Sequence, residues 1–116
     1  MKKLYNVKSF NELEYILYCT ISKDRTNPTS KSTIYSLTGI KERLAKQLIR
    51  SLRNKGVPVC SKICNGGGYW IEDNKEEFGK FVLQQKTELE GYKKTINILC
   101  KIYHSIPGED PNELFI

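Results

Sequence analysis

The segment STIYSLTGIKERLAKQLIRSLRNKGVPV, residues 32–59, separates two helix-like stretches by a single glycine. Ser30 is a suitable N-cap for a short helix over residues 31–37, in which Ile34 and Leu37 are expected to face inward. Gly39 is expected to end this helix, because glycine readily adopts the left-handed conformation common at helix C-termini. Two helices joined by a short turn that contains glycine form a helix-turn-helix, so this segment predicts one.

The second helix of this unit, predicted over residues 41–54, has an apolar face and a basic face. The apolar face is Leu44, Ala45, Leu48, Ile49 and Leu52. The opposite face has the spacing i, i+3, i+4, i+7 and consists of Arg43, Lys46, Gln47 and Arg50. In a helix-turn-helix the second helix enters the major groove, where Arg and Gln bond bidentately to guanine and adenine and Lys contacts a base edge or a phosphate. With Lys41 at its start, this helix is the predicted DNA-binding element. The alternative is an ordinary surface helix with a charged outer face.

A β-hairpin is predicted after this helix. Gly56 caps the helix, and VPVCSKI is an alternating, β-branched run that is typical of a strand. The stretch CNGGG contains Asn65-Gly66, a strong hairpin signal, and YWIE is the second strand-like run. Pro58 is compatible with an edge strand. In a winged domain the hairpin lies beside the second helix, so Lys62 and the glycine-rich tip are expected to approach the phosphate backbone.

A further helix is predicted before the helix-turn-helix, over residues 10–21, with a capping box of Ser9 and Glu12. Its expected inward stripe is Phe10, Leu13, Ile16, Leu17 and Thr20. The polar segment 22–30, which contains Pro28, is expected to be a loop. Residues 1–73 are therefore expected to form one domain. Its predicted class is α+β, mostly helical: a winged helix-turn-helix of three helices plus a two-stranded β-hairpin.

The stretch 27–73, with LTGI, LIRSLRNKGVPV and GGGYWIED, resembles the small winged-helix proteins of bacteriophages and prophages of Gram-positive bacteria. The resemblance covers about half of the chain. It implies a winged helix-turn-helix fold and a role in phage replication or in the control of transcription. Two positions depart from the usual pattern: Lys41 stands where Ser or Thr often caps the second helix, and Tyr35 stands where a small residue often lies in the helix before it.

A long helix without proline is predicted over residues 74–104. Its seam alternates spacings of four and three, at Phe78, Val82, Gln85, Leu89, Tyr92, Ile96, Leu99 and Tyr103. At 1.5 Å per residue the helix would be roughly 45 Å long, which is more than a domain of this size can cover.

We expect a homodimer in which two copies address two DNA half-sites. The dimerisation residues are Leu89, Tyr92, Ile96, Leu99 and Tyr103. Gly79, Gly91 and the polar Gln85 weaken the seam. The alternative is therefore a helix that bends at Gly91 and folds back over its own domain.

The net charge of +6 is unevenly distributed. Residues 1–73 carry 13 basic and 6 acidic side chains, residues 74–104 carry 6 and 4, and residues 105–116 carry only 3 acidic ones. This balance favours a polyanionic partner for the first domain, and double-stranded DNA fits it. No segment resembles a membrane span or a signal peptide, so we expect no membrane association and a cytoplasmic protein, in a bacterial host cell by the resemblance. The four cysteines are expected to stay reduced.

The sequence gives little reason to expect catalysis, a metal or a cofactor. The single histidine, His104, has no Ser or Asp partner that chain order supports, and NGGG lacks the Lys-Ser/Thr of a phosphate-binding loop. Cys60 and Cys64 are four residues apart, as are Cys100 and His104, but on a strand the first pair would be about 13 Å apart. We expect a protein that is not an enzyme. Zinc binding is the alternative to cysteines that only fill the core.

The remaining segment, SIPGEDPNELFI at residues 105–116, is expected to be a flexible acidic tail. Its NELF resembles the motif by which replication proteins hold the bacterial sliding clamp. Leu114 and Phe115 are therefore candidate contacts with a replication or host protein, and the alternative is a tail that packs on its own domain. For the whole chain, the competing function is a protein-interaction module. In that role the winged fold acts as a phage adaptor, or inhibits a host replication or defence protein, without reading DNA.

Overall fold

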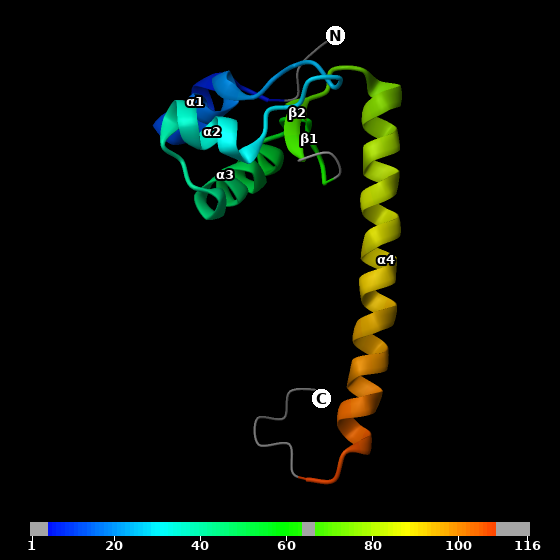
Figure 1. The fold of residues 1–116 in the computed structure, drawn as a ribbon. Helices are drawn as coiled ribbons and strands as arrows, with labels where there is room; N and C mark the ends of the chain where they lie inside the picture. The colour runs from blue at the N-terminus through cyan, green and yellow to red at the C-terminus, as the bar shows by residue number, and fades with distance from the viewer. Residues whose placement is uncertain (1–4, 64–66, 109–116) are drawn as a thin grey trace. The chain divides into compact units, whose positions relative to one another are not determined.

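In the computed structural model, residues 5–63 and 67–108 are described, and they form four α-helices and one antiparallel pair of strands (Figure 1). The chain divides into two compact units, Met1–Gly79 and Lys80–Ile116. The first unit contains a short 3₁₀ helix and the elements α1 to β2. The last helix, α4 (Lys75–Ser105), begins in the first unit and provides the regular structure described in the second.

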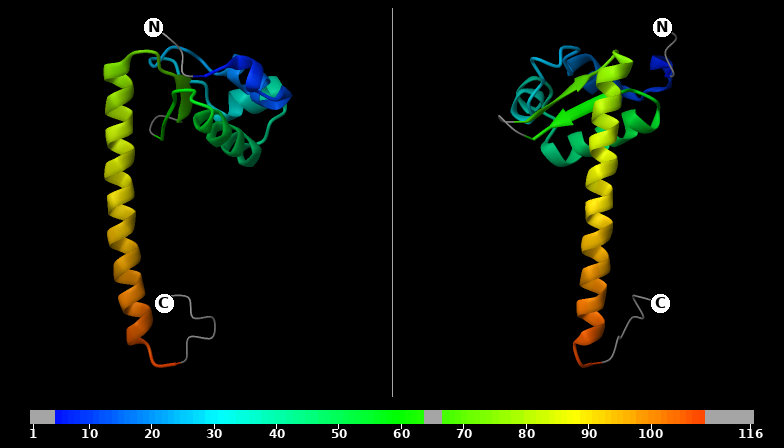
Figure 2. Two further views of the ribbon diagram at one scale, coloured as in Figure 1. Left: turned by 180° about the vertical axis from the view of Figure 1, so that it is seen from behind. Right: turned by 90° about the vertical axis from the view of Figure 1, so that its right-hand side faces the viewer.

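The first unit has the element order predicted for a winged helix-turn-helix. A 3₁₀ helix (Val7–Ser9) precedes three α-helices, which are α1 (Glu12–Thr20), α2 (Lys31–Thr38) and α3 (Glu42–Asn54). The strands β1 (Val59–Lys62) and β2 (Gly68–Ile71) follow. In Figures 1 and 2 the three helices lie on one side of the hairpin. The structure thus confirms a mostly helical α+β fold, with a hairpin and a long C-terminal helix.

Part of the segment that the sequence predicts to be a loop pairs with strand β2 of the hairpin. Within the hairpin, the register runs from Val59 opposite Ile71 to Lys62 opposite Gly68. Outside it, Thr29 forms an isolated antiparallel bridge with Tyr69, in which the two residues exchange hydrogen bonds of 2.8 and 2.9 Å. The prediction of an unpaired loop is therefore wrong at Thr29, because the free edge of β2 supplies backbone partners.

Gly68 allows this close approach. Its φ is +143°, a conformation that L side chains rarely adopt, and a Cβ built on it would lie 2.8 Å from Cβ of Pro28 and 3.0 Å from the carbonyl oxygen of Thr29. A side chain would therefore separate the Thr29 segment from β2. Gly68 belongs to the glycine run that the sequence assigns to the hairpin tip, but its structural role is in pairing this third segment.

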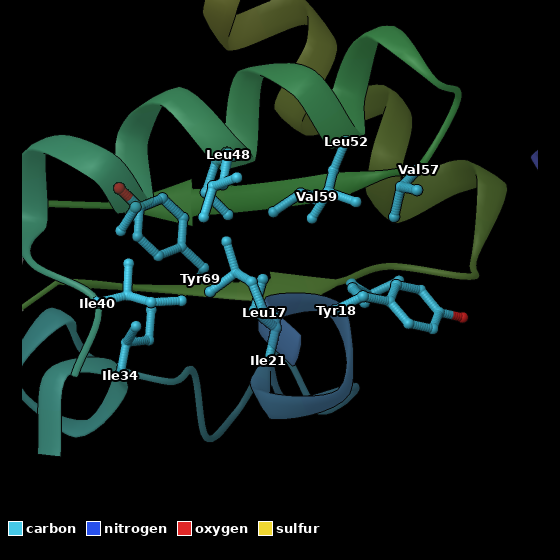
Figure 3. Packing of buried hydrophobic residues seen from close by; sticks show 13 residues of the cluster. Leu17, Tyr18, Ile21, Ile34, Ile40, Leu48, Leu52, Val57, Val59 and Tyr69 are labelled. Atoms are coloured by element: carbon cyan, nitrogen blue, oxygen red, sulfur yellow. The ribbon is translucent and has the colours of Figure 1, made fainter. Parts of the chain in front are cut away.

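The core of the first unit lies between α1, α2, α3 and the hairpin (Figure 3). Its buried members are Leu17, Tyr18, Ile21, Ile34, Ile40, Ala45, Leu48, Ile49, Leu52, Val57, Val59, Tyr69 and Ile71. The apolar side chains of the 3₁₀ segment and its flanks, Tyr5, Val7 and Phe10, are partly buried against this cluster. Burying apolar side chains from α1, α2, α3 and both strands favours one compact arrangement of those elements.

In α1 the predicted cap and buried face are wrong by a few residues. Asn11, not Ser9, is the N-cap, and the capping box pairs it with Glu14 through two hydrogen bonds of 2.8 Å. Leu17 is buried as predicted, but Leu13 and Ile16 are 42% and 37% exposed. The helix instead turns Glu14 inward, toward a cation and a hydroxyl near the end of α3. Local periodicity does not predict this contact between two helices.

The turn between α2 and α3 forms as predicted. Gly39 has φ +75° and donates its N–H to the Tyr35 carbonyl at 2.8 Å, which closes the C-terminus of α2. Lys41 is the N-cap of α3 and makes no side-chain capping bond. Two predicted inward residues, Leu37 and Leu44, are 70% and 38% exposed. The next apolar residue, Ile40, enters the core after the turn, so an inward Leu37 is not needed to bury this end of α2.

The buried carboxylate of Glu14 connects α1 to the C-terminal end of α3. It accepts hydrogen bonds from the backbone N–H of Asn11 at 2.8 Å, from the Nζ of Lys55 at 2.6 Å, and from the hydroxyl of Ser51. Lys55 also donates to the carbonyl of Ser9 at 2.8 Å. The hydrogen bonds from Asn11, Lys55 and Ser51 outweigh the effect of burial and lower the pKa of Glu14 to about 2.

This network generates a prediction about acid stability. Because the pKa of Glu14 is lower in the folded state, its stabilisation is present above about pH 4.5 and is lost as the pH falls toward 2. We expect Glu14→Gln to lower the free energy of unfolding at pH 7 by about 2–3 kcal/mol and to flatten its decline below pH 5. Urea unfolding at several pH values measures both effects. The matched control is Glu12→Gln in the exposed first turn of α1, which should change stability by less than about 0.5 kcal/mol. Equal pH dependence in Glu14→Gln and the wild type would contradict this role.

Candidate nucleic-acid interface

Helix α3 and its N-cap carry all of the predicted DNA-binding side chains except Lys62. All of them are exposed, namely Lys41, Arg43, Lys46, Gln47 and Arg50. The opposite face of the helix is buried through Ala45, Leu48, Ile49 and Leu52. Because residues on one helical face repeat about every 3.6 positions, burial of this apolar stripe directs the polar stripe to solvent. The structure therefore gathers Arg43, Lys46, Gln47 and Arg50 on one accessible surface.

One acidic residue lies within this basic surface. Glu42, in the first turn of α3, pairs with Lys46 at 3.2 Å and with Lys31 at 2.8 Å. The hydrogen bond from Lys31 lowers the pKa of the Glu42 carboxyl the most, and the one from Lys46 lowers it further. All three side chains are exposed, so the ion pairs are weak and can exchange one partner for another. A negative side chain also stabilises a helix N-terminus by interacting with the helix dipole.

Sequence reasoning missed Lys31 as a member of this surface. It is the first residue of α2, and it reaches α3 only because the turn at Gly39 brings the start of α2 close to the start of α3. The separation of 11 residues between Lys31 and Glu42 matches no local spacing rule. The stretch from Lys31 to Arg50 contains five basic residues and one acidic residue, Glu42, so its net charge is +4.

The hairpin runs alongside α3. Figure 3 shows Val59 near Leu52, toward the C-terminal end of α3, and Tyr69 nearer to Ile40. Strand β1 therefore begins beside the end of α3 and runs back toward its start, and Lys62 is the last residue of β1. Lys62 is half-buried. The predicted turn residues Asn65 and Gly66 lie outside the described residues.

Arg53 attaches the hairpin to α3. Its Nε donates to the carbonyl oxygen of Val59 at 2.9 Å, and its Nη2 lies 3.3 Å from the hydroxyl of Ser61. Burial lowers the pKa of Arg53 below the usual arginine value. This residue is basic and lies on α3, but its hydrogen bonds to β1 make it a structural contact and not a candidate for binding DNA.

A second buried carboxylate belongs to Glu72, the residue directly after β2. It accepts a hydrogen bond from Arg25 at 3.0 Å, from the Trp70 indole at 3.2 Å and from the backbone N–H of Asn74 at 3.2 Å. Arg25 also lies 3.5 Å from Glu77. The side chains of Glu72 and Arg25 thus join the segment before α2, strand β2 and the first turn of α4. Arg25 is engaged in this network, although its sequence position gives no sign of it.

Helix α4 presents the predicted dimerisation residues to solvent. None of its residues is buried, and Leu89, Tyr92, Ile96 and Leu99 are between 53% and 66% exposed. Tyr103 is half-buried and its ring lies 5.4 Å from that of His104, centre to centre. The helix continues through Gly91 without interruption, so the alternative of a bend there is wrong. The intrahelical hydrogen bonds on both sides of Gly91 outweigh the modest helix penalty of one glycine.

The candidate metal-binding residues do not form a cluster in the described part of the chain. Cys60 is buried, and burial raises the pKa of its thiol to about 12. Cys64, its proposed partner, lies outside the described residues. Among residues 5–63 and 67–108, no three His, Cys, Asp or Glu side chains are arranged to hold a metal ion. The tail residues Leu114 and Phe115 also lie outside the described residues. None of the helices described is long and apolar enough to span a bilayer.

Comparison with known proteins does not assign a family. No protein-family model matches the chain, and no solved structure matches it. Over 87 residues, covering 72% of this chain, the sequence is 32% identical to chitinase ChiA of Flavobacterium johnsoniae. The chain spans only 6% of the length of that chitinase. The similarity therefore concerns a small part of a much larger protein.

Proposed function

We propose that the chain binds double-stranded DNA through α3, with α2 and the hairpin contacting the phosphate backbone. The observation that carries the proposal is the exposed row of Arg43, Lys46, Gln47 and Arg50 on the outer face of the second helix of a helix-turn-helix. Such a helix fits the major groove, and these side-chain types are the ones that bond to base edges there. The net charge of +4 between Lys31 and Arg50 adds the attraction for phosphate.

The side chains divide into two roles. Arg43, Gln47 and Arg50 are assigned to base edges, because Arg and Gln can form paired hydrogen bonds with guanine and adenine. Lys31, Lys41 and Lys46 are assigned to phosphates. On binding, Lys31 and Lys46 exchange the Glu42 carboxylate for phosphate oxygens, which costs little because their ion pairs are exposed. Lys62 contributes a further phosphate contact from the hairpin.

The proposed cellular role follows from the resemblance to phage winged-helix proteins. In this role the chain acts as a homodimer, joined through α4, in phage-type replication or transcription control in the cytoplasm of a bacterial host. Two recognition helices then address two half-sites. The proposal contains no catalytic step, and similarity to 6% of a chitinase supplies no reason to add one. In this proposal, Leu114 and Phe115 of the tail are the residues that contact a replication or host protein.

A protein-interaction module is the second candidate function. It is favoured by apolar side chains that the winged domain leaves exposed, among them Tyr35 at 53% and Leu37 at 70% on α2. Exposed apolar side chains bind other proteins where they form a contiguous patch. Binding to random-sequence duplex separates the two functions. A DNA-binding protein loses affinity steeply as salt increases, whereas a module that ignores DNA shows no such binding.

The first test concerns base readout by α3. After selection of the preferred duplex from a random pool, Arg43→Ala, Gln47→Ala and Arg50→Ala should each weaken binding by about 1–3 kcal/mol and relax preference at one base position. Fluorescence anisotropy on the preferred and mismatched duplexes measures both effects. The control is Lys94→Ala, which removes an exposed charge from α4 and leaves α3 intact. Equal losses of affinity on every sequence would reassign these residues to phosphate contacts. If none of the variants lost affinity, α3 would be excluded as the DNA-binding element.

The second test concerns the hairpin. Lys62→Ala should weaken binding to all duplexes alike and reduce the slope of log K against log salt by about one unit, because one phosphate contact releases roughly one counterion. Titrations over a series of salt concentrations measure the slope. A loss restricted to one sequence would instead place Lys62 in a groove, contrary to the assignment.

The third test concerns association through α4. Ile96→Asp places a charge in the apolar seam, so a homodimer should dissociate to monomer in sedimentation equilibrium, and affinity for a duplex with two half-sites should fall toward that of one. Asn97→Asp is the matched control, because it adds the same charge one position outside the seam. The winged domain should stay folded in both variants, since Ile96 lies outside its core. An Ile96→Asp variant that sediments like the wild type would remove this surface from the dimer.

A further inference from the structure

The second unit contains an apolar stripe that its own described residues do not cover. In the heptad notation abcdefg, the a positions of α4 are Val82, Leu89, Ile96 and Tyr103, and the d positions are Phe78, Gln85, Tyr92 and Leu99. From Val82 to Leu99 these positions are exposed. A single helix cannot bury one of its own faces, so the stripe is open to a second helix along this whole stretch.

We infer that a second copy of the chain covers this stripe as a parallel, in-register coiled coil, with Glu88 of each copy paired with Lys93 of the other. This inference rests on the homodimer in the proposed function, but not on DNA binding. Three features of α4 support it: the charges beside the seam, the polar residue within it, and the shapes of its apolar residues.

The charges beside the seam distinguish the two possible orientations. Glu88 occupies a g position, whereas Lys86 and Lys93 occupy e positions. In a parallel pair, each g residue faces the e residue five positions later in the other copy, so Glu88 faces Lys93 twice. In an antiparallel pair with the seam fully overlapped, e residues face e residues, so Lys86 faces Lys93 twice. Opposite charges therefore meet only in the parallel arrangement.

These charged side chains are available in the structure. Glu88 forms no ion pair with the described residues, and Lys93 pairs only with Glu90 of its own helix, at 3.3 Å. Lys93 and Glu90 are 60% and 67% exposed, so this contact is weak and leaves Lys93 able to approach a second helix.

The polar seam residue Gln85 also favours the parallel arrangement. In register, the two Gln85 amides face each other, and each amide has both donors and an acceptor for the other. In the antiparallel alignment, Gln85 would face Ile96, which would leave a buried amide without a partner. A single polar residue at a core position selects one register at some cost in stability.

The apolar residues fit a two-stranded assembly. Val82 and Ile96 are β-branched and occupy a positions, while Leu99 occupies a d position, as parallel dimers prefer; Leu89 at an a position and Tyr92 at a d position do not follow this preference. Leu83 and Ile98 are exposed but lie outside the seam, at b and c positions, and the coiled coil does not account for them. Since each winged domain precedes α4 in its chain, parallel helices connect both domains to the same end of the coiled coil.

The test uses charge reversal in the full-length chain, with dissociation constants from sedimentation equilibrium at low salt. Lys93→Glu brings two acidic side chains together at each facing pair of positions 88 and 93, and Glu88→Lys brings two basic side chains together there. Each variant alone should therefore dimerise roughly tenfold more weakly than the wild type. An equimolar mixture of the two should recover much of the lost affinity as a heterodimer, because one copy then carries acidic side chains at both positions and the other carries basic ones. The double variant, Glu88→Lys with Lys93→Glu, should recover as well.

The rescue by mixing removes an ambiguity in the single variants. Lys93→Glu also places two acidic residues at positions 90 and 93 of one helix and weakens that helix, whereas the mixture tests charges between chains. Lys94→Glu, at the f position away from the seam, is the matched control and should change dimerisation little. Circular dichroism reports the helix content of each variant.

Two results would overturn the inference, and they are distinguishable. Tighter association of Lys93→Glu would indicate an antiparallel pair, because Lys86 would then face an acidic side chain at position 93; the homodimer would stand, but its orientation would change. A wild type that sediments as a monomer at every concentration would remove the second copy altogether and assign the stripe to a different protein or to another segment of this chain. Neither result bears on DNA binding, which the α3 variants test separately.

Discussion

The arrangement of the first unit depends on a charge that is held away from water. Glu14 on α1 is buried, and its carboxylate is stabilised by a backbone N–H, a hydroxyl and the ammonium of Lys55. An unpaired carboxylate at this place would cost several kcal/mol, so α1 and the C-terminal end of α3 are held in the one arrangement that supplies these partners. Apolar packing alone is less specific, because many arrangements bury similar area.

The position of α3 is what makes its outer face usable. Glu14 and Ser51 fix one end of the helix against α1, and Arg53 attaches it to β1. The core residues of α3 then determine which side is exposed. A recognition surface needs this rigidity, since side chains that read bases must be held in register with the groove. The two carboxylates, Glu14 and Glu72, therefore act on the proposed interface indirectly, by positioning α3 and the hairpin.

The two units differ in how far their apolar side chains are buried. The first unit buries its apolar residues against one another, whereas α4 carries a regular stripe with no covering element among the described residues of its own unit. Three charges of α4 flank its seam, with Glu88 at a g position and Lys86 and Lys93 at e positions. Such flanking charges are the positions that set orientation in a coiled coil.

Local sequence determined the elements of this protein. Periodicity, capping residues and glycines predict three short helices, a hairpin and a long helix, and the structure confirms them to within a few residues, because helices and turns depend on neighbours close in the chain. The outer face of α3 follows from its apolar face by the same geometry. Periodicity was insufficient for α1, where Leu13 and Ile16 are exposed and Glu14 is buried.

Only the tertiary structure decided the contacts between distant segments. The Glu14–Lys55 pair, the Arg25–Glu72 pair and the bridge between Thr29 and Tyr69 each join residues about 40 or more positions apart, and the Lys31–Glu42 pair crosses the turn at Gly39. No spacing rule can reveal them, because a charged residue in a sequence does not show whether it will meet solvent, a ligand or an opposite charge. That choice is made when helices pack, since packing determines which polar groups lose water and must find partners within the protein.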